Sequence, residues 1–382
     1  MSRPNLRRSF SLESLESREV LSAGGPSAEA QYMLELINQA RTNPQAMADR
    51  VTTDLDPDVM ATVKYYGTNL NAVHDAINNV PARPPVAWSD QLAAAATGQS
   101  LDQNNTGIQT HQGADGSWLG QRLDRIGVSN RVAEGENAYA YSQSVDHAME
   151  AFLIDWGVAD AGHRRNILQP DANPDQYYKE VGIGIVDSTR PGFGPKVITQ
   201  DFATRAGQKA FVVGVTYSDS NGNGRYDMNE GRGDVDVTAV NIGNGQITSV
   251  QSWDAGGYQI PLDPGGYDVT ARVNGNVVRS DRVWIGNQNV KVDYNLINPG
   301  PSTVPAPVTP TPVVAAPVAQ PTVVNPVTPV NAWNALSNSG QSSQYTAQVQ
   351  AQTLIAPTRS AAARTGGGWL TNWSAWTARR SR

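Results

Sequence analysis

The sequence predicts an α+β protein in which a helix-rich first half is followed by a smaller all-β region and a proline-rich tail. Apolar residues recur every three to four positions within residues 28–152, which is the period of helices packed on a core. From residue 180 onward, alternation with a period of two indicates strands. Residues 299–330 then hold ten of the 24 prolines, and such a stretch is extended and low in complexity.

Composition and charge limit the classes of function. At 382 residues the chain can form two ordinary domains and a linker. The net charge is −6, and residues 299–382 hold five Arg and no Asp or Glu, so the first 298 residues carry −11, that is, −6 less those five charges. A folded part this acidic argues against nucleic-acid binding. The chain has no cysteine, which excludes disulfides and thiolate metal sites. It also has no apolar run of the ~18 residues that a transmembrane helix needs.

The N-terminal segment, residues 1–27, is expected to be a leader or export segment. Arg3, Arg7 and Arg8 precede a stretch that acidic residues interrupt, so it lacks the apolar core of ~7–15 residues found in a secretory signal. The string Leu-Glu-Ser-Leu-Glu-Ser-Arg-Glu-Val-Leu-Ser-Ala at 12–23 resembles an N-terminal motif of exported planctomycete proteins.

Five helical stretches are expected ahead of the first main strands. Residues 28–42 place apolar side chains at i, i+3, i+4 and i+7, and Asn43-Pro44 ends this helix because the residue before proline leaves the helical region. A less regular helical stretch lies within residues 57–78. Ser89 is expected to cap the next helix. The last two stretches are predicted at 117–127 and from Val145 through Phe152.

Strands are expected at residues 180–186 and 196–203, which predicts helices packed against a small antiparallel sheet. Short alternating runs between Gly-rich turns predict a β-sandwich over residues 208–296. Its strands are expected at 210–217, 235–240, 246–253, 258–260, 267–273 and 290–294. Beyond it we expect a Pro/Val/Thr-rich linker at 297–330 and a low-complexity, disordered tail at 331–382.

Three of the four histidines fall within residues 111–163, which also contain a Gly-Glu-Asn motif at Glu136. Histidine and carboxylate groups bind divalent metals and move protons near neutral pH. His111 follows a helix in a Gly-containing turn, Glu136 precedes a strand-like run, and His163 begins a short helix. Each of these residues is, by itself, more often structural. Their spacing matches no local metal motif.

Several motifs occur in one order along the chain. They are Leu-Glu-Leu-Ile-Asn-Gln-Ala-Arg-Thr-Asn-Pro (34–44), Trp88 with Leu92-Ala93, His111-x-Gly, Arg125-Ile126-Gly127, Gly135-Glu136-Asn137, Gly162-His163-Arg164-x-Asn166-Ile167-Leu168 and Val181-Gly182-Ile183-Gly184. In this order they resemble the bacterial branch of the CAP superfamily of cysteine-rich secretory proteins, antigen 5 and pathogenesis-related 1 proteins. The resemblance covers residues 28–204 and implies an α/β/α sandwich with a central cleft.

The resemblance also implies what the cleft contains. In the family, a His-Glu-Glu/Asp-His tetrad can hold a divalent cation, often zinc. Three members match by motif and are expected to lie within ~4–6 Å of one another: His111, Glu136 and His163. Asp155 is expected as the fourth, with Asp160 as the alternative because the residues between them disturb the register. Such a set suits zinc with a position open for water, unless it only joins the cleft walls by hydrogen bonds. His147 and His74 are expected to be ordinary surface or capping residues.

Residues 219–230 have the spacing of a calcium-binding loop. Gly224 stands at position 6, and the Arg225 carbonyl is expected at position 7. Side-chain oxygens fall at positions 1, 3, 5, 9 and 12, namely Asp219, Asn221, Asn223, Asp227 and Glu230. The pattern from Gly214 to Val235 is similar to the B-type repeats of bacterial surface adhesins, which implies a calcium-stiffened extracellular module. A polar hairpin without an ion is the alternative.

Together these features predict an extracellular or cell-envelope protein, for which three hypotheses stay open. The first, which we favour, is a binding protein whose cleft holds a small molecule, a lipid, an envelope glycan or a divalent metal. The second is a metal-dependent hydrolase with Glu136 as general base between His111 and His163. The third is a purely structural surface protein. No Gly-x-Ser-x-Gly elbow accompanies the cleft residues, which favours binding over catalysis.

Overall fold

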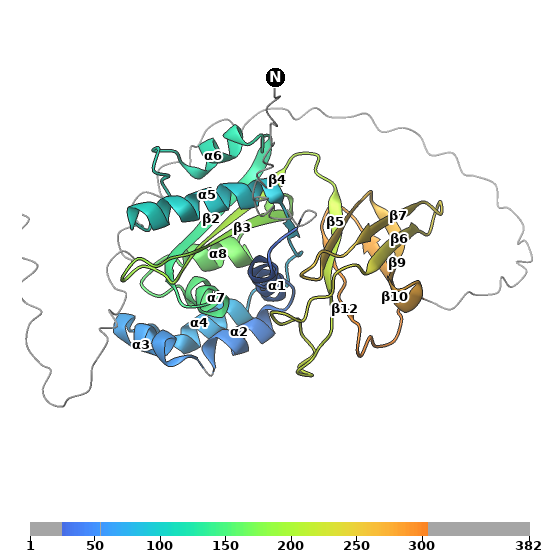
Figure 1. The fold of residues 1–382 in the computed structure, drawn as a ribbon, viewed down its shortest axis with the longest axis horizontal. Helices are drawn as coiled ribbons and strands as arrows, with labels where there is room; N and C mark the ends of the chain where they lie inside the picture. The colour runs from blue at the N-terminus through green and yellow to red at the C-terminus, as the bar shows by residue number, and fades with distance from the viewer. Residues whose placement is uncertain (1–24, 54, 305–382) are drawn as a thin grey trace, which may run out of the picture.

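A computed structural model describes residues 25–53 and 55–304 of the chain. The leader motif at 12–23, most of the expected linker and the expected tail lie outside these residues. Figure 1 shows a helix-rich part, which contains a sheet, beside a strand-rich part. Within the described part of the chain, no helix combines the length and apolar character needed to cross a membrane.

The helix-rich part is built around a four-stranded sheet with the order β1-β3-β4-β2. Strands β2 (Arg131–Ser142) and β3 (Glu180–Asp187) both pair antiparallel with β4 (Lys196–Arg205), and the short β1 (Ala87–Trp88) pairs parallel with β3. The expected antiparallel pair is confirmed. Glu136, however, lies inside β2 and not before a strand, so its side chain has a fixed place on one face of the sheet.

Helices cover both faces of this sheet (Figure 1). Helix α5 (Asp90–Thr106) lies very close to β3 because Gly182 and Gly184 have no side chains: an added Cβ would stand 1.9 Å from the Ala93 nitrogen and 2.2 Å from the Thr97 nitrogen. The opposite face is covered by α1 (Ala28–Thr42), α7 (Val145–Ile154) and α8 (Gly162–Leu168), whose buried side chains share one cluster with β3 and β4. This gives three layers.

The remaining helices differ from the expected ones in two ways. They are α2 (Pro44–Thr52), α3 (Pro57–Tyr66), α4 (Leu70–Asn78), α6 (Leu119–Arg125) and the 3₁₀ helix η1 (Pro174–Gln176). The single stretch expected over 57–78 is two helices, since Gly67 (φ 63°) ends α3 in the left-handed conformation. Asn43 ends α1 as expected. Its side chain also accepts the Ala46 N–H, so the same residue caps the start of α2, which the sequence did not predict.

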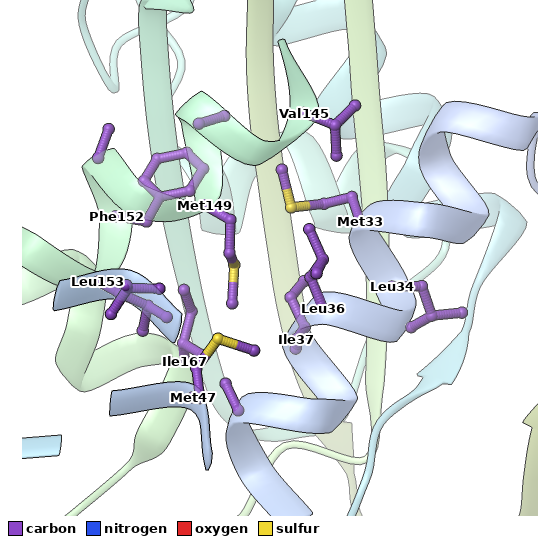
Figure 2. Packing of buried hydrophobic residues seen from close by; sticks show 14 of the residues in the cluster. Met33, Leu34, Leu36, Ile37, Met47, Val145, Met149, Phe152, Leu153 and Ile167 are labelled. Carbon is purple, nitrogen blue, oxygen red and sulfur yellow. The ribbon is translucent and has the colours of Figure 1, made fainter. Parts of the chain in front are cut away.

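The core of the helix-rich part lies between α1, α7 and the sheet. Figure 2 shows Met33 and Ile37 of α1 close to Met149 and Phe152 of α7, with Met47 of α2 beside them. These side chains are at most 2% exposed. Burial of such side chains contributes about 1.5–3 kcal/mol each, and it holds the helices that carry the candidate site against the sheet.

Two sheets make up the strand-rich part. One has the order β10-β9-β6-β7, and in the other β5 pairs with β8, β11 and β12. The strands are β5 (Ala210–Tyr217), β6 (Asp236–Asn241), β7 (Ile247–Gln251), β8 (Gly257–Leu262), β9 (Gly265–Val273), β10 (Asn276–Ile285), β11 (Val290–Lys291) and β12 (Tyr294–Asn295). The sequence did not predict β10, because polar residues interrupt its alternation. The strand expected at 290–294 is two short ones.

The two parts share buried contacts, although the sequence suggested a boundary near residue 206. Tyr217 and Tyr226 belong to the same buried cluster as α1. The Lys291 Nζ lies 2.7 Å from the Glu35 Oε2 of α1, and both side chains are buried. Burial raises the pKa of Glu35 to about 7, against the lowering effect of Lys291. The Asn289 amide donates to backbone carbonyls of the first part. The strand-rich part is therefore packed onto α1 and not tethered to it by a flexible joint.

Candidate functional site

The first of two histidine–carboxylate pairs joins His111 to Glu136. His111 lies in the turn after α5, and its Nδ1 is 2.8 Å from the Glu136 Oε1. The Glu136 side chain is buried, whereas a third of the His111 side chain is exposed. The other carboxylate oxygen of Glu136 pairs with Arg122 of α6. Because a carboxylate accepts the Nδ1 proton, the neutral ring has its lone pair on Nε2.

The second pair joins His163 to Asp155. The His163 Nδ1 is 2.7 Å from the Asp155 Oδ1, and the Asp155 side chain is fully buried. The other oxygen of Asp155 accepts the backbone N–H groups of His163 (2.9 Å) and Arg164 (3.1 Å), so it also caps α8. Of the two candidates Asp155 and Asp160, it is therefore Asp155 that binds His163. Its own backbone is left-handed, with φ 58°.

Side-chain amides tie the two pairs together. The Asn166 amide donates to the Glu136 carbonyl (3.1 Å) and to the Asn137 Oδ1 (2.9 Å), and the Asn137 amide donates to the His163 carbonyl (3.2 Å). Strand β2 and helix α8 are thereby joined at the residues that carry the two pairs. The close approach of the His163 ring to His111 and Glu136 stays a prediction.

Asp201 is a member of this site that sequence reasoning missed. It lies on β4 directly opposite Glu136 in the register and is fully buried. Among the described residues, no N–H donor reaches either of its oxygens. Burial, and then the charge of Glu136, raise the pKa of Asp201 well above its usual range. Burial beside the Glu136 carboxylate therefore favours the neutral form of Asp201. The available signal was the single carboxylate of the strand at 196–205.

The same contacts define what Glu136 can do chemically. Burial by itself would raise the pKa of Glu136, but His111, Arg122 and the hydrogen bond from Asp201 lower it. A carboxylate whose two oxygens are already engaged by His111 and Arg122 is a weak base and a poor proton acceptor. The basic atoms that the two pairs leave uncommitted are the Nε2 atoms of His111 and His163.

The other two histidines have structural positions. His147 is only 7% exposed and packs against Tyr139 and Trp156, so the expectation of a surface residue was wrong. Its Nδ1 accepts the Gln143 N–H at the start of α7, which is a capping role. Burial lowers its pKa. His74 is partly exposed and lies 3.0 Å from Asp49.

In the loop at 219–230, Asp219 is held by the backbone around it. Its two oxygens accept the N–H groups of Asn223 (3.1 Å) and Gly224 (2.9 Å), and the Asn295 amide donates to it from β12. The Arg225 N–H donates to the Asn223 Oδ1 (2.8 Å). The backbone of this half of the loop therefore folds around the Asp219 carboxylate, the first expected ligand.

The other half of the loop is organised by Glu230 and Asp227. Glu230 accepts the Ser220 N–H (2.9 Å) and the Asp227 N–H (3.0 Å), and it is buried. The amides of Asn221 and Asn223 both donate to the Asp227 Oδ2, at 2.7 and 2.5 Å. The structure thus gathers all five expected side chains into one loop between β5 and β6.

Two observations restrict what the residues around the histidines could bind. Within residues 25–53 and 55–304, no three His, Asp or Glu side chains are grouped so that they would hold a metal ion. The larger described cavity, of about 590 Å³, does not lie at the histidines. It lies where the start of α1 meets the strand-rich part, and Tyr226, Trp253 and Asp254 help to line it.

Comparisons with known proteins agree with the motif order. Residues 34–202 match the model of the CAP family, described as the cysteine-rich secretory protein family, and this supports a CAP (SCP) domain over that segment. No curated protein sequence matches the chain. Among solved structures, an extracellular protein containing a SCP domain from Bacillus anthracis str. Ames is 26% identical, with a TM-score of 0.26. The match covers 40% of this chain and only 44% of that one. The structure of BmVAL-1 is 15% identical, with a TM-score of 0.19, and covers 40% and 80% of the two chains.

Proposed function

We propose, on the premise that residues 34–202 form a CAP domain, that this domain binds a divalent cation through His111 and His163. The observation that carries the proposal is that each Nδ1 is paired with a buried carboxylate, at 2.8 and 2.7 Å. Metal-binding histidines are oriented in this way by a carboxylate behind them, and the opposite nitrogen is left for the metal. The protein is then an extracellular binding protein.

The residues present suit zinc better than a hard cation. Two imidazole nitrogens are borderline-soft donors, whereas calcium and magnesium prefer oxygen. In this assignment, Glu136 and Asp155 orient the rings and do not coordinate the ion. A zinc ion held there would act as a Lewis acid for an oxygen of a bound ligand. Arg122 keeps Glu136 charged and prevents it from turning toward the cleft.

The hydrolase hypothesis is weakened by the same contacts. It requires Glu136 to take a proton from water, but both oxygens of Glu136 are engaged, by His111 and by Arg122. A base committed to two donors is poorly placed for proton transfer. We therefore propose binding and not catalysis as the function of the site.

Zinc titration of the full-length protein by calorimetry tests this proposal. The wild type should bind one zinc ion at the cleft, and His111→Ala and His163→Ala should each weaken binding by at least tenfold. His74→Ala is the matched control, because His74 also contacts a carboxylate but is outside the site. Wild-type affinity in either cleft variant would overturn the assignment.

We also propose that the loop at 219–230 binds calcium. The spacing of side-chain oxygens at loop positions 1, 3, 5, 9 and 12, with glycine at position 6, supports this. A rotated Asn amide presents its oxygen in place of its nitrogen, so the pairs with Asp227 are compatible with a bound ion. Extracellular sites of this class have dissociation constants of ~10⁻⁴–10⁻³ M.

A further inference from the structure

The outer face of the sheet β10-β9-β6-β7 is a flat exposed surface. Alternate side chains of these strands, such as Val237, Val269 and Val283, point inward and belong to the buried cluster that β5 and β8 complete. Their neighbours along each strand therefore point outward. Figure 1 shows this sheet on the side of the strand-rich part away from α1.

A tryptophan dominates one end of this face. Trp284 of β10 is 70% exposed, and it stands opposite Gly266 of β9 in the register. A Cβ added at Gly266 would lie 2.9 Å from the Trp284 Cζ3 and 2.6 Å from the Ile242 Cδ1. The absence of a side chain at Gly266 thus lets Trp284 and Ile242 lie against the sheet. So large an apolar surface in water is costly, and packing in the core does not explain it.

The rest of the face mixes polar residues with apolar ones such as Ile247, and its charges balance, since Arg272 stands opposite Asp236 in the register. Arg282 next to Trp284 binds Asp268 with two hydrogen bonds, of 2.7 and 2.8 Å, so the two charges cancel. One row further, hydroxyl groups pair across the strands. These pairs are Thr270 with Ser280 (2.8 Å) and Thr238 with Ser249 (3.1 Å).

We propose that this outer face binds a neutral polysaccharide, with one sugar ring stacked on Trp284 and its hydroxyls bonded to the adjacent polar rows. An aromatic ring offers a flat, polarizable face to the C–H side of a pyranose, and Trp also gives large contact area at low entropic cost. The ion pair and the hydroxyl groups supply donors and acceptors without net charge. A neutral face selects a neutral ligand that is rich in hydroxyl groups.

Other occupants fit this face less well. Nucleic acid and anionic lipid require an excess of cations, whereas Arg282 is paired with Asp268 and Arg272 stands opposite Asp236 in the register. Addition of a peptide strand requires an open edge. The edge of β10, the strand that carries Trp284, is already engaged, because Thr303 donates to the Ser280 carbonyl and the Ser302 hydroxyl accepts the Ser280 N–H. The other edge strand, β7, is at the opposite end of the sheet from Trp284.

Affinity electrophoresis of the full-length protein tests the proposal. The native gels contain hydroxyethyl cellulose or glycol chitin, which are uncharged β-1,4-linked glycans. At least one should retard the wild type, and Trp284→Ala should weaken the apparent affinity roughly tenfold. Trp118→Ala is the matched control, since Trp118 is also exposed (44%) but lies on the other part of the molecule.

A second variant keeps the aromatic ring but moves it. Gly266→Ala should tilt Trp284 and Ile242 away from the sheet, and it should weaken retardation less than Trp284→Ala does. Both variants should keep the wild-type melting temperature within a few degrees, because Trp284 is mostly in solvent. Equal retardation of the wild type and Trp284→Ala would overturn the proposal. No retardation by either glycan would do the same, and so would Trp284-dependent binding to phosphatidylglycerol vesicles, which would indicate a lipid surface.

Discussion

Asp201 shows how one residue sets the chemistry of the candidate site. It is fully buried opposite Glu136 in the strand register, and burial together with the charge of Glu136 raises its pKa. Two buried carboxylates in contact cannot both be charged without a large energetic cost. Of this pair, Glu136 is the favoured anion, because His111 and Arg122 hold its two oxygens.

Replacing Asp201 with Asn should change how stability depends on pH. A carboxyl group whose pKa is raised by folding stabilises the protein at low pH, and this contribution is lost as the pH rises through the folded-state value. Asn donates a similar hydrogen bond at every pH. In chelator-treated protein, the melting temperature of the wild type should therefore fall more steeply toward alkaline pH than that of Asp201→Asn. Parallel curves from pH 4 to 9 would show that Asp201 is ionised throughout.

The sequence predicted the site residues that belong to a recognisable motif, and it did not predict the one that lies outside any motif. His111, Glu136, Asp155 and His163 could be named because they match a family pattern. The partner of Glu136 is set by strand register, and register depends on which strands pair across 65 residues of chain. A single sequence does not contain that information for Asp201.

At the scale of elements, two glycines explain the close contact of α5 with β3. Gly182 and Gly184 alternate on the face of β3 that α5 covers, and the Val-Gly-Ile-Gly string at 181–184 was visible in the sequence. The structural reason for this string could not be read from the sequence, because two glycines in a strand also suit a bulge or a bend. The structure shows that they allow a helix backbone to touch a strand.

Gly182→Ala should therefore strongly destabilise the protein, while Gly98→Ala should not. The new methyl group at position 182 would overlap the backbone of α5, which cannot move aside as a flexible side chain does, so we expect a loss of about 3 kcal/mol or more. Gly98 lies within α5 with nothing within 4 Å of an added Cβ. Alanine there should stabilise the helix by about 0.5–1 kcal/mol. Chemical denaturation measures both, and equal stability of the two variants would contradict the close packing.

At the scale of the whole molecule, the two parts behave as one packed body in the described residues. Tyr226, which belongs to the loop at 219–230, packs against Tyr32 of α1 at 6.4 Å between ring centres. Tyr32 in turn donates to Asp146 of α7. Sequence reasoning divided the chain where the periodicity changes, but periodicity reports local structure and not which surfaces are buried together. An isolated segment 208–296 would separate Lys291 from Glu35 and Tyr226 from Tyr32.

Calcium should consequently stabilise the full chain and not only its strand-rich part. If the dissociation constant is ~10⁻⁴ M, millimolar calcium adds about 1.4 kcal/mol, which corresponds to a rise of a few degrees in melting temperature. Asp219→Ala should abolish the rise. Asp254→Ala, an exposed carboxylate outside the loop, should keep it. Identical melting of the wild type with calcium and with chelator would mean that the loop is a polar hairpin.

The position of a bound zinc ion tests the central claim most directly. Crystals of the full-length protein grown with zinc would be measured on both sides of the zinc absorption edge. The account predicts an anomalous peak bonded to the Nε2 atoms of His111 and His163, with Glu136 still on the Nδ1 of His111 and Asp155 still on that of His163. A peak bonded to the carboxylate of Glu136, or no peak near either histidine, would contradict it.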